Sequence, residues 1–135
     1  MSTEAEMSKQ IITTDQAPAA VGPYSQGVKL DGWIWTCGQV ALDPETGEMV
    51  GSDAPTQADR ALRNIEAILQ AAGSSLERVV RVTVYLTNMD DFGAVNEVYA
   101  RHFSQAFPAR ACVEVSRLPL GALVEIDAIA RVEEG

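Results

Sequence analysis

The segment from Thr56 to Ala72 constrains the fold more than any other part of this sequence. Its apolar residues recur at intervals of three and four, and charged or amide side chains occupy the opposite side. This spacing predicts an amphipathic helix that ends near Gly73 and must pack its stripe against another apolar surface. The stripe consists of Ala58, Ala61, Leu62, Ile65, Leu69 and Ala72.

Alternating apolar residues on both sides of this helix predict the strands of a sheet. The Asp31-Gly32 pair lies between two such stretches and is typical of a tight hairpin turn. A second helix is expected to begin at Asp90 or Asp91 and to run to about Ala106. The expected strands cover residues 28–40, divided by the turn, and residues 48–50, 79–86, 111–115 and 124–132. In the strand over 79–86, the residues expected on one face are Val80, Val82, Val84 and Leu86.

In chain order these segments give β-β-β-α-β-α-β-β, which is typical of an α+β sandwich. Both helices need an apolar partner, so we expect them on one face of a roughly six-stranded mixed sheet. Residues 11–135 would form this single domain, and the polar residues 1–10 a flexible N-terminal segment. The other face is expected to mix polar and apolar groups, which favours a subunit contact with a site in it. Its polar members would be Arg110, Cys112, Glu125 and Asp127.

The composition excludes several classes of function. The formal net charge of −9 repels phosphate backbones, so we expect no nucleic-acid partner. No apolar run approaches the roughly 18 residues that span a membrane. Two cysteines and one histidine, far apart in the chain, do not predict a metal site, and no glycine-rich phosphate loop is present. We expect two free thiols in a reducing cytoplasm.

Four polar residues are candidates for chemistry, and each also has a structural interpretation. Arg110 shares a strand face with Cys112; its guanidinium suits a carboxylate ligand, or a surface ion pair. Glu125 alternates with apolar residues along its strand. Its carboxylate could hold a water and transfer protons, or it could belong to a solvated strand face. Tyr24, between glycines, suits a ligand contact or a packed loop. Asn96 lies in the apolar stripe of the second helix, so its buried amide needs a hydrogen-bond partner. In the structural interpretation that partner is the main chain or a neighbouring loop; in the functional one it belongs to the site.

Several short motifs resemble the RidA/YjgF reactive-intermediate deaminases. They follow the family's order over nearly the whole chain, from about Ile11 to Arg131, which makes the resemblance specific. The sharpest match is Phe107-Pro108-Ala109-Arg110-Ala111-Cys112-Val113-Glu114-Val115, continuing through Arg117-Leu118-Pro119 to Val124-Glu125-Ile126-Asp127-Ala128. The others are Gly22-Pro23-Tyr24-Ser25-Gln26-Gly27, Thr36-Cys37-Gly38-Gln39, Asp43-Pro44-Glu45-Thr46-Gly47-Glu48, Asn64-Ile65, Asp91-Phe92 and Val95-Asn96.

The resemblance implies a chorismate-mutase-like fold and a homotrimer whose sheets meet around a central barrel, with clefts between subunits. It also implies hydrolysis of small carboxylated enamines and imines, such as 2-aminoacrylate, to 2-oxo acids and ammonia, without a cofactor or metal. Arg110 would bind the substrate carboxylate, and Glu125 would orient water and relay protons. Tyr24, the third catalytic residue, would line the cleft with Asn96. Gly38 and Cys112 would offer backbone contacts to the substrate, and Cys37 a further contact.

This sequence departs from the family pattern at two positions and leaves other functions open. Many relatives have serine where Cys37 stands, which affects the expected substrate preference, and serine often replaces Ala111. A pathway-specific deaminase acting on an aminomuconate-like enamine would use the same arginine. A non-enzymatic trimer that binds small acids or holds unfolding proteins would not need Glu125. Ribonuclease activity, ascribed to some relatives, is disfavoured by the net charge of −9.

Overall fold

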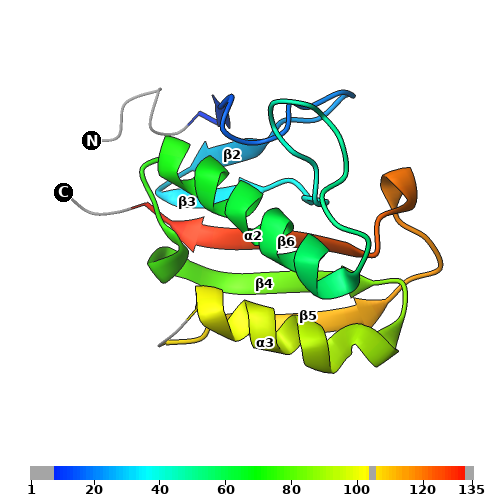
Figure 1. Cartoon of the computed structure of the whole chain (residues 1–135). Coiled ribbons are helices and arrows are strands. Elements are labelled where there is room, and N and C mark those ends of the chain that lie inside the picture. The colour runs from blue at the N-terminus through cyan, green and yellow to red at the C-terminus, as the bar shows by residue number, and fades with distance from the viewer. Residues whose placement is uncertain (1–7, 104–105, 133–135) are drawn as a thin grey trace.

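Six strands form one mixed sheet in the order β1-β2-β3-β6-β4-β5 (Figure 1). The computed structural model describes residues 8–103 and 106–132. All neighbouring strands are antiparallel except β4 and β5, which are parallel. The strands are β1 (Gln10–Ile12), β2 (Gly27–Leu30), β3 (Trp33–Thr36), β4 (Val79–Leu86), β5 (Ala109–Glu114) and β6 (Val124–Arg131).

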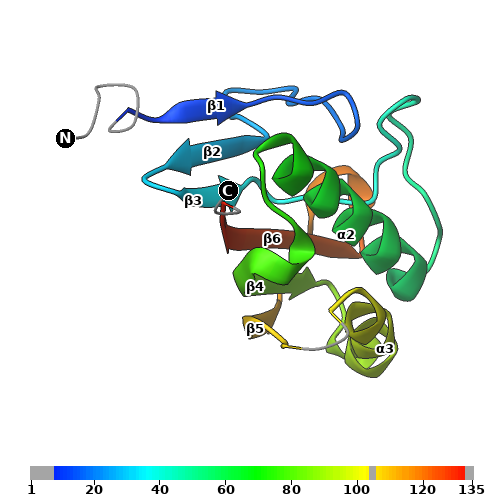
Figure 2. The ribbon, with the colours of Figure 1, turned by 90° about the vertical axis from the view of Figure 1, so that its left-hand side faces the viewer.

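Two helices, α2 (Ala54–Ala71) and α3 (Phe92–His102), cover one face of this sheet and leave the other open (Figure 2). The predicted α+β class, with both helices on one face, is confirmed. Three short 3₁₀ turns complete the described elements: η1 (Leu76–Arg78), η2 (Met89–Asp91) and η3 (Pro119–Gly121). Within the described residues, neither helix combines the length and apolarity needed to cross a membrane.

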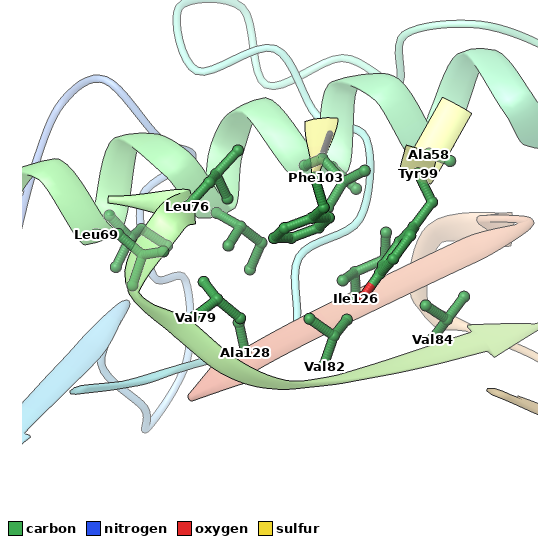
Figure 3. Packing of buried hydrophobic residues seen from close by; sticks show 14 of the residues in the cluster. Ala58, Leu69, Leu76, Val79, Val82, Val84, Tyr99, Phe103, Ile126 and Ala128 are labelled. Carbon is green, nitrogen blue, oxygen red and sulfur yellow. The ribbon is translucent and has the colours of Figure 1, made fainter. Parts of the chain in front are cut away.

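The core lies between the helices and the sheet (Figure 3). On the strands it takes alternate residues, such as Val82 and Val84 of β4 and Ile126 of β6, because successive side chains point to opposite faces. On α3 it takes Tyr99, whose ring contacts that of Phe103 at a centroid distance of 4.7 Å. The mutual burial of these faces is what fixes the helices on this side of the sheet.

Helix α2 starts slightly earlier than its apolar stripe. The Asp53 side chain accepts a hydrogen bond from the Thr56 N–H at 2.8 Å, and Pro55 follows in the first turn. Both are favourable N-terminal residues, so the helix extends to Ala54. At the other end Gly73 adopts a positive φ of 82°, as the sequence predicts for a helix terminus.

Several local predictions differ from the structure. Residues 48–50 form no strand, only a single bridge between Leu42 and Met49. The first strand is instead β1, which begins at Gln10; residues 1–7 of the expected N-terminal segment lie outside the described residues. Helix α3 ends at His102 rather than near Ala106, because Phe103 leaves helical geometry and packs into the core.

The face of Val80 was also predicted incorrectly. The register between β4 and β6 shifts between Val79 and Arg81, so Val80 is the extra residue of a β-bulge. Val79 is buried in its place, and Val80 is 40% exposed. Simple alternation fails here because a bulge adds one residue to one strand only.

Candidate active site in two halves

A groove lies beside the C-terminal end of β3. Its polar wall is formed by Tyr24, the Cys37–Gln39 segment and Glu125 of β6. Apolar side chains that include Val21 and Leu120 form its rim, and its cavity volume is about 920 Å³. This volume is near the upper end for small-molecule sites, so a small acid would fill only part of it.

The Cys37–Gln39 wall exists because the segment after β3 contains one extra residue relative to β6. Trp35 pairs with Ile129 and Gln39 with Ile126, so four steps along this segment oppose three along β6. Such bulges bend a strand and redirect its side chains, often beside active sites. The Cys37 N–H turns instead to the Gln26 carbonyl, at 2.8 Å.

Glycine at position 38 lets the Glu125 carboxylate approach the main chain. A Cβ added to Gly38 would lie 2.5 Å from Glu125 Oε2, so the carboxylate would have to move to make room for it. The Gly38 N–H has no hydrogen-bond acceptor among the described residues. This main-chain group and the carboxylate therefore lie together at the polar end of the groove.

The groove favours the neutral forms of Glu125 and Cys37. Partial burial raises the pKa of Glu125, and the negative charge of Asp127 raises it further. Burial likewise raises the pKa of the Cys37 thiol, although Gln39 Nε2 donates a hydrogen bond to its sulfur at 3.2 Å. Glu125 is therefore suited to accepting a proton, and Cys37 is not activated as a nucleophile.

A second set of residues surrounds Arg110 on the helix-covered face. The guanidinium carbon lies 4.7 Å from the centroid of the Tyr99 ring and 5.4 Å from that of Phe92. Arg110 Nη1 also donates a hydrogen bond to Asn96 Oδ1 at 2.8 Å. These three α3 side chains hold the guanidinium in one orientation, while most of its five donors are not used by any described residue.

The prediction that Arg110 and Cys112 share a face with Glu125 and Asp127 is wrong. Arg110 pairs with the buried Val82, and Cys112 packs against the core, so both point towards the helices. Glu125 pairs with Tyr85 on the open face. Alternation fixes which residues of one strand share a face, but not which face of the sheet that is.

The structure thus divides the predicted site residues into two groups. Tyr24, Cys37, Gly38 and Glu125 line the groove of the open face. Asn96 and Arg110 are in direct contact on the other face, where Cys112 is also located. Burial raises the pKa of the Cys112 thiol, with Arg110 opposing that change.

Two buried amides to which the sequence analysis assigned no role support the groove. Asn64 Nδ2 donates to the carbonyls of Val40 and Leu42, at 3.2 and 3.0 Å. Gln57 Oε1 accepts from the Leu123 N–H, at 2.8 Å, just before β6. Both amides lie on the buried side of α2, seven residues apart, and that spacing was a detectable signal in the sequence.

Two more residues of the open face were not assigned a role from the sequence. Tyr85 OH donates a hydrogen bond to Asp127 Oδ2, at 3.1 Å, next to Glu125.

No group of three or more His, Cys, Asp or Glu side chains in the described parts of the chain is arranged to hold a metal ion.

Comparisons with known proteins agree on one family. Residues 14–132 match the model of the family described as endoribonuclease L-PSP. A RutC family protein of Pyrococcus abyssi is 50% identical over 127 residues, covering 94% of this chain and all of the relative. The mouse protein named 2-iminobutanoate/2-iminopropanoate deaminase is 48% identical over 122 residues, or 90% of each chain. The crystal structure of E. coli TdcF with bound serine superposes with a TM-score of 0.88 at 42% identity, covering 92% of this chain and 99% of that one.

Proposed function

We propose that this chain, which belongs to the endoribonuclease L-PSP family that includes the RidA/YjgF proteins, hydrolyses 2-imino acids and their enamine tautomers to 2-oxo acids and ammonia. The mouse relative named as such a deaminase supports this reaction. Its substrates would be reactive products such as 2-aminoacrylate and 2-iminopropanoate, so the role is removal of damaging metabolites.

The observation that carries the proposal is that the Arg110 guanidinium is held in place without a carboxylate partner among the described residues. In a chain with a net charge of −9, this half-buried arginine has no carboxylate partner among the described residues. Asn96 and two aromatic rings orient it instead. A guanidinium held in this way suits a ligand carboxylate bound through two parallel hydrogen bonds.

The remaining steps need little further machinery. A protonated imine carbon is already electrophilic, so the protein has to position a water and manage protons. Glu125 takes a proton as the water oxygen bonds to that carbon, and it returns a proton to the nitrogen. The carbon–nitrogen bond then breaks and ammonia leaves, while Glu125 takes the hydroxyl proton and the former imine carbon becomes the carbonyl of the 2-oxo acid.

This mechanism requires two subunits at each site. Arg110 and Glu125 point to opposite faces of the sheet, with β4 between their strands, so a small acid cannot touch both within one subunit. We propose a homotrimer in which the Glu125 groove of one subunit meets the Arg110 side of its neighbour. The open face suits such a contact, since it exposes Trp35 and Val113, each 41% accessible, among its polar residues.

The family description names an endoribonuclease, but the charge of this chain does not favour RNA. Backbone recognition depends on clustered lysine and arginine, and the chain has 10 basic against 19 acidic residues.

We also propose a reducing, cytoplasmic location. This is supported by two free thiols, Cys37 and Cys112, on opposite faces of the sheet.

The decisive experiment generates 2-aminoacrylate in situ with a dehydratase and follows its loss and the release of ammonia, with and without this protein. We expect faster loss, and a fall on the order of 100-fold in Arg110→Ala. Arg101→Ala, at an exposed position of α3, is the matched control. Light scattering establishes that each variant keeps the assembly of the parent.

Three outcomes would contradict parts of the proposal. An assembled protein that gives no acceleration on any small imine would exclude the deaminase. Binding of small acids without ammonia release, unaffected by Glu125→Gln, would indicate a binding protein. Activity restricted to an aminomuconate-like enamine would keep the chemistry and assign it to one catabolic route.

A further inference from the structure

Glu125 has a second carboxylate beside it on the same strand face. Asp127 follows it by two residues in β6, so both side chains point to the open face. On the adjacent strand, Tyr85 lies opposite Glu125 and Thr83 lies opposite Asp127. Tyr85 is therefore next to both carboxylates.

The two carboxylates differ in their hydrogen bonds. Tyr85 OH donates to Asp127 Oδ2 at 3.1 Å. No donor to the Glu125 carboxylate is found in the described parts of the chain; instead, the open space of the groove lies in front of it. A donated hydrogen bond stabilises an ionised carboxylate, whereas two half-buried carboxylates close together resist being ionised at the same time.

We propose that Tyr85 and Asp127 are positioning residues for the proton of this pair: Tyr85 keeps Asp127 ionised, so that Glu125 is the carboxyl that takes up the proton in the groove. This inference rests on the proposed function, because it assigns the proton acceptor of the same reaction. It adds two residues that contact neither the groove nor the substrate but decide which carboxyl reacts.

The electrostatics of the open face agree with this assignment. Burial raises the pKa of Glu125 and the charge of Asp127 raises it further. Burial raises the pKa of Asp127 too, but the bond from Tyr85 opposes that change, as do Thr83 and the charge of Arg81. The groove is also lined by the ionisable groups Tyr24, Cys37, Asp43 and Glu45, and Arg131 of β6 lies on the same face over the Trp33 ring. Burial raises the pKa of the Cys37 thiol, so this thiol stays neutral near neutral pH.

The test is the pH dependence of kcat/KM for imine hydrolysis, with the imine-generating enzyme in excess at every pH. If Glu125 must be ionised to accept a proton from water, activity falls on the acid side as Glu125 becomes protonated. Asp127→Asn removes the neighbouring charge, so Glu125 stays ionised to lower pH and the acid limb moves to lower pH. Asp90→Asn, which removes one exposed charge from η2, is the control and should leave the limb in place.

Tyr85→Phe is the more specific variant, because it changes one hydroxyl. Without that donor Asp127 takes up a proton at higher pH, and Glu125 then has a neutral neighbour. We therefore expect the acid limb to move in the same direction as in Asp127→Asn, but by less. A purely structural role for Tyr85 would change stability or the amplitude of the profile and not the position of its limb.

A second readout separates this inference from the proposed reaction. Carbon-13 NMR of labelled carboxyl groups follows both titrations without substrate, with Glu125→Gln identifying the Glu125 signal. We expect Glu125 to titrate at lower pH in Asp127→Asn and Tyr85→Phe. Unchanged titration of Glu125 in folded variants would overturn the inference even if the wild type is an active deaminase. A shifted titration in a protein that hydrolyses no imine would retain the pair and exclude the proposed function.

Discussion

Arg110 and Glu125 extend from opposite faces of a single sheet. Arg110 is level with Val82 on the side covered by the helices, and Glu125 is level with Tyr85 on the open side. Any reaction that uses both side chains at one small substrate therefore takes place between chains. Because each chain carries both halves, the two functions can be removed separately and recombined.

Mixed assemblies test this division. Arg110→Ala and Glu125→Gln subunits should each be inactive alone. When they are denatured together and refolded at equal concentration, some interfaces join an intact Arg110 side to an intact Glu125 groove. Random mixing in a closed ring should restore about a quarter of the wild-type activity. Two assembled variants that stay inactive after mixing would place both residues at one site within a single chain.

Gly38→Ala should reduce activity without unfolding the protein. The new methyl group would lie 2.5 Å from Glu125 Oε2, so the carboxylate must move away from the groove. Displacing a proton-transferring group by this much lowers kcat/KM on the order of 100-fold. Steady-state kinetics and urea unfolding measure the two effects separately.

Gly93→Ala is the matched control for that variant. Gly93 lies within α3, and an added Cβ meets nothing within 4 Å. The free energy of unfolding should rise by up to about 1 kcal/mol, because alanine is the better helix former. Its activity should match that of the wild type; equal losses in both alanine variants would remove the argument based on Glu125.

Asn64→Leu should destabilise the chain more than any surface substitution. Asn64 is fully buried, and its amide bonds the Val40 and Leu42 carbonyls while accepting from Arg60. Leucine leaves these groups without their partner, which costs about 2–4 kcal/mol of unfolding free energy. Urea unfolding at a fixed subunit concentration measures it, with the exposed Gln70→Ala as control. A loss below about 1 kcal/mol would show that water replaces the amide.

Cys37 should react slowly with alkylating reagents near neutral pH. Burial raises the pKa of its thiol, so the reactive thiolate is scarcer than in an unfolded chain at the same pH. In a Cys112→Ala background, iodoacetamide labelling followed by mass spectrometry should be several-fold slower than in urea. Labelling should accelerate as the pH rises towards the pKa. An equal rate in urea and in buffer would mean that the thiol is fully accessible and unperturbed.

Much of the fold follows from periodicity in the sequence. The stripe of α2 and the alternation of β6 each specify a buried face, and faces of this kind pair in only a few ways. Short elements are harder to predict from the sequence. Strand β1 has only three residues, and no turn residue beside it marks its position in the sequence. Residues 48–50 have the sequence pattern of a strand but form only one bridge.

The sequence names candidate site residues, but it does not place them in space. The motifs identify Arg110 and Glu125, but the face of β5 depends on how the chain returns from α3, which alternation does not encode. The contact between Gly38 and Glu125 arises from an extra residue opposite β6, and no local sequence pattern predicts that bulge. The bond from Tyr85 to Asp127 joins residues 42 positions apart.

The extra residue after β3 also determines where this molecule can move. Between Trp35 and Gln39 the ladder to β6 is interrupted, and the Ala128 N–H bonds the Thr36 hydroxyl instead. Stretches with fewer ladder bonds open at lower free energy than the core. We therefore expect the main-chain amides of the groove wall to exchange with solvent faster than those of the layer packed beneath α2.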